Sequence, residues 1–468
     1  MNQLILLEVV YPFRIHFFLN LSQTTSPLRL VCKNRKREFT MKKYEAAIIG
    51  GGISGLTAAV YLAKAGISTV VIEKGKALGG RAKTVKKNGA YFNIGAHALY
   101  KGGAAEAVLD ELGIELSGGV PDTKGRAIWN GSIFSLPASL PSLLSTKLLS
   151  LSGKIELGKV MRKLMNLKPA SIGERSLRDW AESEMTDPMV RHAFYALCRT
   201  STYCIGPENQ QAAIVLDQVQ RGMNGVFYID GGWQSMIDPL KKKAIDFGAD
   251  IVHQSAVSIK KKSGFEITLK NGDIIQVPMV LSTASPEQTF SLIEGAAGTS
   301  LETWRQRVKP IYAACLDVSL RHLPKPNEQF AIGIDQPILF TNQSRAAQLS
   351  DNGSSVISLI KYLGTDSASN AQSDQRELEN FLELMQPGWR KELEGYQYLP
   401  HITVSNGSCA MNGYLPLGPS VPDIPGLYIA GDGAGRTELL ADAAFASAKR
   451  ASALMIQKCA NPGILKEA

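Results

Sequence analysis

The pattern of hydrophobic positions is clearest over residues 44–73. An apolar run from Ala46 to Ile49 is long enough for a buried parallel strand, and a second apolar, β-branched run ends at Ile72. Between them, Thr57 to Lys64 carries apolar residues at helical spacing. The order strand, helix, strand predicts a βαβ unit, which is a building block of parallel sheets.

A glycine-rich turn joins the first strand to the helix. Gly50 permits a tight turn, Gly52 lets backbone approach a pyrophosphate, and Gly55 lets helix and strand pack closely. Glu73 ends the second strand, 23 residues after Gly50, where a carboxylate can accept hydrogen bonds from ribose hydroxyls and repels a 2′-phosphate. Because a helix N-terminus also attracts phosphate, this unit predicts a dinucleotide site for NAD or FAD.

The C-terminal part carries a second glycine-rich turn. An apolar run from Gly426 to Ala430 predicts a strand, and it leads directly into Gly431 and Asp432. Residues 440–448 then open a helix that is rich in small side chains. Small side chains let the helix N-terminus approach a ligand, and the helix dipole stabilises negative charge there.

Two middle segments differ in character from these ends. Residues 103–224 show mostly helical spacing, with a strand pair predicted within 126–136. Between these two segments the nucleotide-binding part resumes, and a hairpin is predicted there over 265–278, where Asn-Gly separates two alternating runs. Residues 300–400 predict a group of strands, antiparallel in arrangement, and one helix over 373–385. These segments predict a second, α+β part of the molecule.

Two further motifs complete a resemblance to a known family. Gly79-Gly80-Arg81 follows the βαβ unit, and Gly95-Ala96-His97 comes soon after. With the βαβ unit and Gly431-Asp432, they resemble the flavoprotein superfamily of amine oxidases, phytoene desaturases and protoporphyrinogen oxidases. The amino-acid sequence of residues 440–448 looks closest to the phytoene-dehydrogenase-related branch. The resemblance runs in order over about residues 44–460 and is most specific at its two ends.

The resemblance implies a bound FAD. It puts Arg81 near the pyrophosphate, residues 95–98 beside the isoalloxazine ring, and the backbone of Val257 against the adenine. It assigns the Asp432 carboxylate to the ribityl or pyrophosphate region. An arginine beside a diphosphate is also sensible by itself, because its planar fork donates two hydrogen bonds at once. The expected cofactor-binding residues are Gly50, Gly52, Ile53, Ser54, Gly55, Glu73, Lys74, Gly80, Arg81, Gly95, Ala96, His97, Ala98, Val257, Gly431, Asp432 and Ala443.

For Cys409 and His97, the sequence favours structural roles over chemical ones. Some amine oxidases attach FAD covalently through a cysteine upstream of the C-terminal strand. The surroundings of Cys409, which lies 22 residues before Gly431, do not match that motif well. A lone histidine without a partner is more often structural than catalytic. We therefore expect non-covalent FAD, and we assign no catalytic residue and no metal ligand.

The expected fold class is α/β, with a discontinuous Rossmann-like FAD-binding domain and an inserted α+β substrate domain. The FAD-binding domain is expected to comprise residues 41–102, 225–299 and 401–468, and the substrate domain residues 103–224 and 300–400. Residues 1–40 do not resemble the rest. A transit peptide and a membrane-surface anchor are two interpretations of this extension. We favour a third, in which the native protein starts at Met41, because that residue opens directly onto the first strand.

Charge and cysteine content limit the classes of partner. The net charge is +9, but residues 1–43 hold 8 Lys/Arg against 2 Asp/Glu, and the remainder holds 43 against 40. The folded part is therefore nearly neutral, which argues against nucleic-acid binding. The 6 cysteines form no C-x-x-C pair, which suits a reducing compartment. We expect a cytoplasmic protein, and membrane association stays open.

These observations predict an FAD-dependent oxidoreductase that takes two electrons, as a hydride or its equivalent, from a small organic molecule. Oxygen or a quinone would reoxidise the flavin. An isoprenoid or carotenoid-like lipid, an amine and protoporphyrinogen are the substrates left open. The rival hypotheses are a flavin-containing isomerase or cyclase without net redox, and a binding protein related to the escort proteins of prenylated GTPases.

Overall fold

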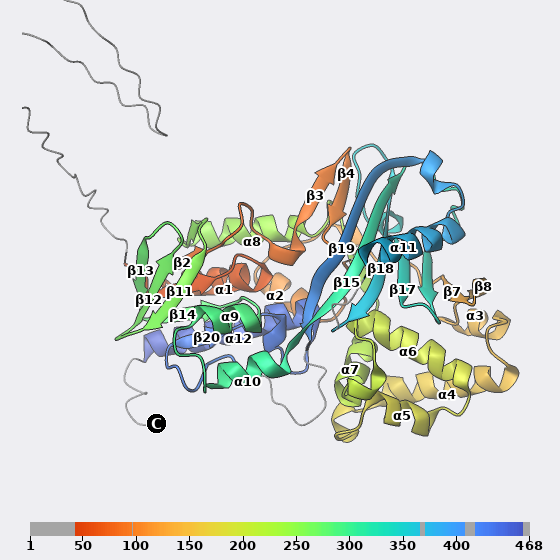
Figure 1. Ribbon diagram of the computed structural model, residues 1–468, viewed down its shortest axis with the longest axis horizontal. Coiled ribbons are helices and arrows are strands. Elements are labelled where there is room, and N and C mark those ends of the chain that lie inside the picture. Colours follow the sequence, from red (N-terminus) through yellow and green to blue (C-terminus); the bar gives the residue numbers. More distant parts are fainter. Residues whose placement is uncertain (1–42, 96, 366–369, 408–416, 462–468) are drawn as a thin grey trace, which may run out of the picture. The chain divides into compact units, whose positions relative to one another are not determined.

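The computed structural model describes residues 43–95, 97–365, 370–407 and 417–461 (Figure 1). The expected extension at residues 1–40, Ala96 and Cys409 lie outside these ranges. A five-stranded sheet and a seven-stranded sheet are the largest sheets of the described chain. No helix within these ranges combines the length and the apolar character needed to cross a lipid bilayer.

The five-stranded sheet is assembled from three distant parts of the chain. Its order is β10-β2-β1-β14-β20, and every neighbouring pair is parallel. Four of the strands are buried at every position, as is usual for parallel strands that are covered on both faces. The discontinuous Rossmann-like arrangement is therefore confirmed. The strands are β1 (Ala46–Ile49), β2 (Thr69–Ile72), β10 (Asp250–Val252), β14 (Met279–Ser282) and β20 (Leu427–Ile429).

Alternate residues of β1 enter two different cores, because successive side chains of a strand point to opposite faces. Ala46 and Ile48 pack with residues of four helices, and Ala47 and Ile49 pack with residues of a small antiparallel sheet. Helices therefore cover one face of the parallel sheet, and the small sheet covers the other. The helices are α1 (Ile53–Lys64), α2 (Ala104–Glu111), α8 (Gln234–Asp246) and α12 (Leu440–Ala460). The small sheet comprises β11 (Ala256–Lys261), β12 (Phe265–Leu269) and β13 (Ile274–Val277), which confirms the predicted hairpin.

The seven-stranded sheet has the order β19-β15-β18-β17-β16-β7-β8. Its neighbouring pairs are antiparallel, except that β16 and β7 run parallel. The strands are β7 (Arg126–Trp129), β8 (Ser132–Ser135), β15 (Lys309–Leu320), β16 (Phe330–Gly333), β17 (Ile338–Asn342), β18 (Ser355–Gly364) and β19 (Leu393–Gly407). Because β7 and β8 come from the first middle segment, the two middle segments form one sheet.

Helices cover both faces of this sheet. Leu378 and Leu382 of α11 (Ala371–Met385) pack in one core with Leu359 of β18, and Figure 1 shows α11 alongside β18. On the other face, Phe194 packs in a core with Ile360. This second face is covered by a bundle of α4 (Leu151–Asn166), α5 (Leu177–Glu184), α6 (Pro188–Thr202) and α7 (Ala212–Met223). The remaining elements are β3 (Thr84–Lys87), β4 (Ala90–Asn93), β5 (Leu99–Tyr100), β6 (Gly118–Gly119), β9 (Val226–Ile229), α3 (Leu140–Ser145), α9 (Pro286–Leu292) and α10 (Ser300–Arg307).

The strand β19 was not expected from the sequence. It is 15 residues long and lies at the edge of the sheet, and it contains Pro400, a residue that within sheets is confined mainly to edge strands and bulges. The pairing with β15 is irregular at this point, because Leu399 pairs with Cys315 and Ile402 pairs with Ala313. A bulge of this kind accommodates a proline within a long strand. The apolar pattern is broken there, and the sequence therefore gives no continuous strand signal.

A test of the helix–strand packing uses Gly55→Ala. An added Cβ would lie 1.9 Å from the carbonyl oxygen of Gly50, so the turn between β1 and α1 would have to move. We expect the free energy of unfolding to fall by about 2 kcal/mol or more, measured by urea denaturation. Gly158→Ala is the matched control in α4, because its Cβ would meet only Leu143 at 3.9 Å. The free energy of unfolding of the control variant should rise by a few tenths of a kcal/mol or more, because alanine has a higher helix propensity than glycine. Equal stabilities of the two variants would contradict this account of the turn.

Candidate functional site

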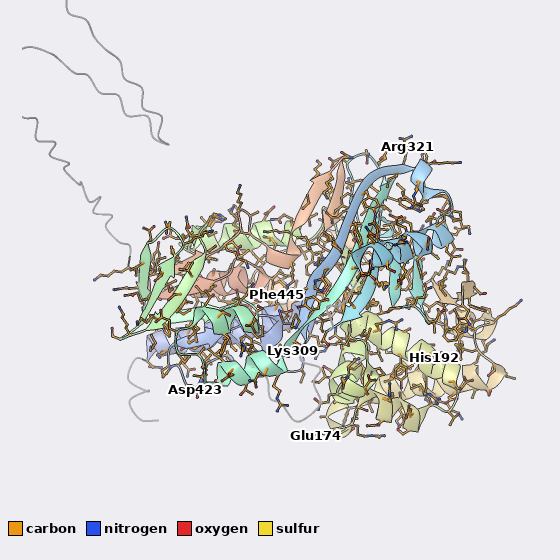
Figure 2. The ribbon with its side chains drawn as sticks, viewed as in Figure 1. Glu174, His192, Lys309, Arg321, Asp423 and Phe445 are labelled. Carbon is orange, nitrogen blue, oxygen red and sulfur yellow. The ribbon has the colours of Figure 1, made fainter. Side chains whose placement is uncertain are left out.

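A cavity of about 1040 Å³ lies at the carboxyl ends of the parallel strands. Ile49 and Ile72 end β1 and β2, Thr283 follows β14, Gly431 follows β20, and all four residues line the cavity. Open α/β sheets bind their ligands at this edge. The cavity also reaches the seven-stranded sheet, since parts of β15 and β19 line it. Lys309, at the start of β15, is one of these residues (Figure 2).

The three glycines of the first turn have different structural roles. Gly50 has a φ of +105°, and a Cβ there would lie 2.7 Å from Thr283 Oγ1. Gly55 packs against the backbone of Gly50, whereas a Cβ on Gly52 would meet only Gly79 O, at 3.9 Å. Gly52 lines the cavity and precedes α1, and no side chain caps the backbone N–H groups of the first turn. The space beside Gly52 and these N–H groups are therefore available to an anionic ligand.

The Glu73 carboxylate holds this turn in place. Glu73 is 8% exposed, and its two oxygens accept hydrogen bonds from Gly51 N at 2.7 Å and Gly75 N at 2.6 Å. It lines the cavity as well. Each carboxylate oxygen has a further lone pair, so Glu73 can still accept a hydrogen bond from a ligand hydroxyl. The sequence predicted the ligand contact, but it gave no signal for the two backbone contacts.

Arg81 and Asp432 form an ion pair within the cavity lining. Arg81 lies in a 3₁₀ turn at Gly80–Ala82, and its Nη1 and Nη2 donate to the two Asp432 oxygens at 2.6 and 2.7 Å. Arg81 Nη1 also lies 3.2 Å from the carbonyl oxygen of Val404, in β19. The Arg81 side chain remains 42% exposed, whereas that of Asp432 is 6% exposed. Arg81 therefore keeps accessible N–H groups while it is held by the carboxylate.

The Asp432 carboxylate also binds β19. It accepts hydrogen bonds from Asn406 N at 2.7 Å, from Asn406 Nδ2 at 3.1 Å and from Ser405 Oγ at 3.1 Å. Burial alone would raise the pKa of Asp432, but the Arg81 guanidinium and the Asn406 hydrogen bonds outweigh it and hold this pKa below its usual value. Asp432 is therefore a buried, ionised group that is fully hydrogen-bonded.

His97 is neutral at pH 7. Its Nδ1 lies 2.7 Å from the carbonyl oxygen of Gly95, so Nδ1–H donates and Nε2 carries no proton in the neutral ring. The ring centroid lies 4.6 Å from that of Trp233. Burial, with a smaller contribution from the positive charge of Arg81, lowers the pKa of His97 to about 4.

The structure brings most of the predicted site residues to this one cavity. Its lining includes Gly50, Gly52, Ile53, Ser54, Glu73, Lys74, Gly80, Arg81, Gly95, His97, Ala98, Gly431 and Asp432. Gly55, Val257 and Ala443 are not among the lining residues. Gly55 supports the turn from behind, Val257 is 50% exposed next to the lining residue Ala256, and Ala443 is fully buried next to Ala444, which lines the cavity. Ala96 lies outside the described residues.

Several cavity residues had not been expected from the sequence. Thr283 Oγ1 donates to Ile49 O at 2.8 Å and lies 3.3 Å from Gly50 O, and this clamps β14 to the glycine turn. The other additions include the following aromatic and basic residues: Tyr100, Tyr203, Trp233, Arg305, Lys309 and Tyr312. Among these, Trp233 carried a local sequence signal, since it directly follows the pair Gly231-Gly232. Both glycines have a positive φ in the structure. The tyrosines reach the cavity through tertiary packing.

Comparison with known proteins agrees with this geometry. Residues 48–112 match the family model described as an NAD(P)-binding Rossmann-like domain. The structure aligns with putrescine oxidase at a TM-score of 0.70, with 16% identity, over 89% of this chain and 99% of that one. The chain shares its fold with putrescine oxidase.

The sequence relatives cover shorter stretches of the chain. The 4,4'-diapolycopene oxygenase of Methylomonas sp is 25% identical over 50% of this chain and 54% of its own length. The protoporphyrinogen oxidase of Homo sapiens is 30% identical over 31% of this chain and 35% of its own length. The chain thus matches about half of the first relative and about a third of the second.

The lowered pKa of His97 predicts a pH effect on stability. As the pH falls from 6.5 towards 4, the unfolded chain binds a proton at this residue and the folded chain does not, so the free energy of unfolding falls. His97→Gln removes this effect, which amounts to about 3 kcal/mol over that window. Burial raises the pKa of Asp317 to about 6, so this residue increases the free energy of unfolding as the pH falls. Its effect cancels in the comparison, because the wild type and His97→Gln both contain Asp317.

The measurement is urea denaturation at pH 7 and at pH 4 for the wild type and for His97→Gln. The exposed His322 provides the control substitution, His322→Gln. The stability difference between wild type and His97→Gln should shrink as the pH falls, whereas the difference for His322→Gln should stay nearly constant. A difference for His97→Gln that does not change with pH would contradict the assignment of a neutral ring.

Proposed function

We propose that the cavity binds FAD non-covalently and that the protein is an FAD-dependent oxidoreductase acting on a small organic molecule. The observation that carries this proposal is the continuity of the cavity. It joins the glycine turn of the parallel sheet to a region lined by aromatic side chains and by the seven-stranded sheet. Its volume of about 1040 Å³ lies at the upper end of the usual range for ligand sites, which suits a dinucleotide-sized ligand together with a substrate.

The residues of the cavity fit FAD. The open space at Gly52 and the uncapped N-terminus of α1 suit a diphosphate, and the remaining lone pairs of Glu73 suit ribose hydroxyls. The accessible N–H groups of Arg81 would add a positive contact to the same ligand. Bound FAD supplies an acceptor for two electrons, which the side chains of the protein do not provide. The residues that would hold it are Gly50, Gly52, Ile53, Ser54, Glu73, Lys74, Gly80, Arg81, Gly95, His97, Ala98, Gly431 and Asp432.

The chain itself would orient the substrate and exclude water. Tyr100, Tyr203, Trp233 and Tyr312 give the cavity an aromatic wall. Burial raises the pKa of Tyr100 to about 12, so its phenol keeps its proton at pH 7. Neutral His97 lies close to Trp233 and adds no charge to this wall. Such a wall offers a large apolar surface to a flat or extended substrate.

An isoprenoid or carotenoid-like lipid is therefore the substrate class that we propose, with oxygen or a quinone as the electron acceptor. The similarity to 4,4'-diapolycopene oxygenase supports the same class. An amine or protoporphyrinogen is the alternative substrate. Anaerobic mixing of the purified protein with each compound distinguishes these cases. Only a compound that the protein oxidises transfers electrons to the flavin and so bleaches its absorbance. Turnover of a polyene without bleaching would instead indicate an isomerase or a cyclase.

The cofactor proposal predicts the behaviour of Gly52→Ser. Serine is a favoured N-cap residue and its Cβ would contact no other part of the protein closely, so the stability of the apoprotein should be unchanged or slightly raised. The same side chain would occupy the space of the diphosphate, and we expect the flavin content of the purified protein to fall at least ten-fold. Absorbance in the visible range measures the flavin, and urea denaturation of apoprotein measures the stability.

Gly158→Ser is the control, because it adds the same side chain to α4, away from the cavity. It should keep the flavin content of the wild type. Wild-type protein that contains no flavin and does not bind added FAD would overturn the cofactor proposal. Yellow colour that stays on the denatured chain would overturn only its non-covalent part.

A further inference from the structure

One surface of the helical bundle combines exposed apolar and basic side chains. The helix α4 packs on the bundle through a buried stripe formed by Gly153, Leu157, Val160 and Leu164. The opposite side of a surface helix is normally polar. In the first half of α4 it is apolar instead, since Leu151 is 77% exposed.

The outward stripe of α4 is apolar in its first half and basic in its second. Ile155 is 56% exposed and lies four residues after Leu151, so the two side chains share one side of the helix. Lys159 and Arg162 continue the same stripe, and both are exposed. This arrangement leaves aliphatic and cationic side chains next to each other in solvent.

The short helix α3 extends the apolar part. Leu140 is 69% exposed and Leu144 is 65% exposed, again four residues apart. Lys154 Nζ of α4 donates to the Leu144 carbonyl oxygen at 2.7 Å, which holds the end of α3 against α4. We use the term α3–α4 surface for the following residues: Leu140, Leu144, Leu151, Ile155, Lys159 and Arg162.

The charge around this surface is strongly positive. Residues 139–171 contain six Lys/Arg and a single acidic residue, Glu156. The Glu156 carboxylate accepts hydrogen bonds from the backbone N–H groups of Thr186 and Asp187, so it is already occupied. Within the described part of the chain, the basic residues that make no ion pair here are Lys147, Lys154, Lys159, Arg162 and Lys168.

A groove at the C-terminal end of α4 gathers several of these charges. It has a volume of about 610 Å³, and Lys159, Arg162, Lys163 and Lys168 line it. Lys163 is paired with Glu184 at 2.6 Å, which leaves three unpaired cations around the groove. Unpaired cations beside exposed aliphatic side chains match a layer that has negative groups above apolar chains.

We propose that the α3–α4 surface docks on a lipid bilayer that contains anionic lipids. Leu140, Leu144, Leu151 and Ile155 enter the boundary between headgroups and acyl chains, and the cations around the groove contact lipid phosphates. An acidic protein partner would satisfy the charges, but the cores of protein interfaces are enriched in aromatic residues, whereas the α3–α4 surface offers aliphatic and cationic side chains only. None of these residues lines the larger cavity, so this inference does not depend on the proposed cofactor.

The test is co-sedimentation of the full chain with phosphatidylcholine vesicles, with and without about a third phosphatidylglycerol. We expect binding to the anionic vesicles, weak binding to the neutral ones, and loss of most binding at about 0.5 M salt, where charges are screened. The double variant K159Q/R162Q should weaken partitioning about thirty-fold. The double variant L151S/I155S should weaken it at least ten-fold.

The matched control lies on α8, where Lys241 is exposed and Ile245 is 47% exposed. The double variant K241Q/I245S changes one basic and one aliphatic residue there, and it should bind anionic vesicles like the wild type. Thermal unfolding of each variant checks that the fold is intact.

Three outcomes would overturn the proposal. They are equal binding of the wild type to neutral vesicles, unchanged binding of both α4 variants, and a wild-type dimer that L151S/I155S dissociates. The last result would show that a second copy of the chain, rather than lipid, covers the α3–α4 surface. The flavin content should be the same in all these variants, so failure here is distinguishable from failure of the cofactor proposal.

Discussion

The ion pair between Arg81 and Asp432 is the interaction on which the site depends. Arg81 follows the first βαβ unit, Asp432 follows the last parallel strand, and Asn406 at the end of the long strand β19 donates to the same carboxylate. The pair therefore connects the parallel sheet to the seven-stranded sheet beside the cavity. Loss of either partner would leave the other charge without its counter-ion. For the Asp432 carboxylate, which is 6% exposed, an unpaired charge would lower the free energy of unfolding.

The sequence predicted those parts of the fold whose signal is local. The strands β1 and β2, the helix α1 between them and the hairpin around Asn271 each show a local apolar pattern next to glycines. The structure has these elements where they were expected. The strand β19 was missed because Pro400 and its bulge interrupt the period. The shared sheet was missed as well, since the parallel pairing of β7 with β16 joins residues that are about 200 positions apart.

The same limit applies to the candidate site. A glycine motif identifies the segment that can approach a phosphate, but it does not say which glycine serves the ligand and which serves the packing. Surrounding atoms distinguish the two positions, because Thr283 lies beside Gly50 whereas the space beside Gly52 is open. Glu73 is a similar case, because it binds the backbone of the turn as well as facing the cavity. A loss of ligand on replacing Glu73 would thus have two physical causes.

The scattered origin of the parallel sheet has a consequence for modularity. The segment matched by the Rossmann-like model, residues 48–112, holds β2 and only the second half of β1, and it lacks β10, β14 and β20. Separated from the rest, its two strands would expose unpaired edges on both sides and the apolar face of α1, which favours aggregation over binding. The lining of the cavity is likewise incomplete without Asp432 and Thr283. The segment is therefore recognisable as a unit of sequence without being a transferable unit of structure, and gene fusions or truncations within the described chain would have to respect that difference.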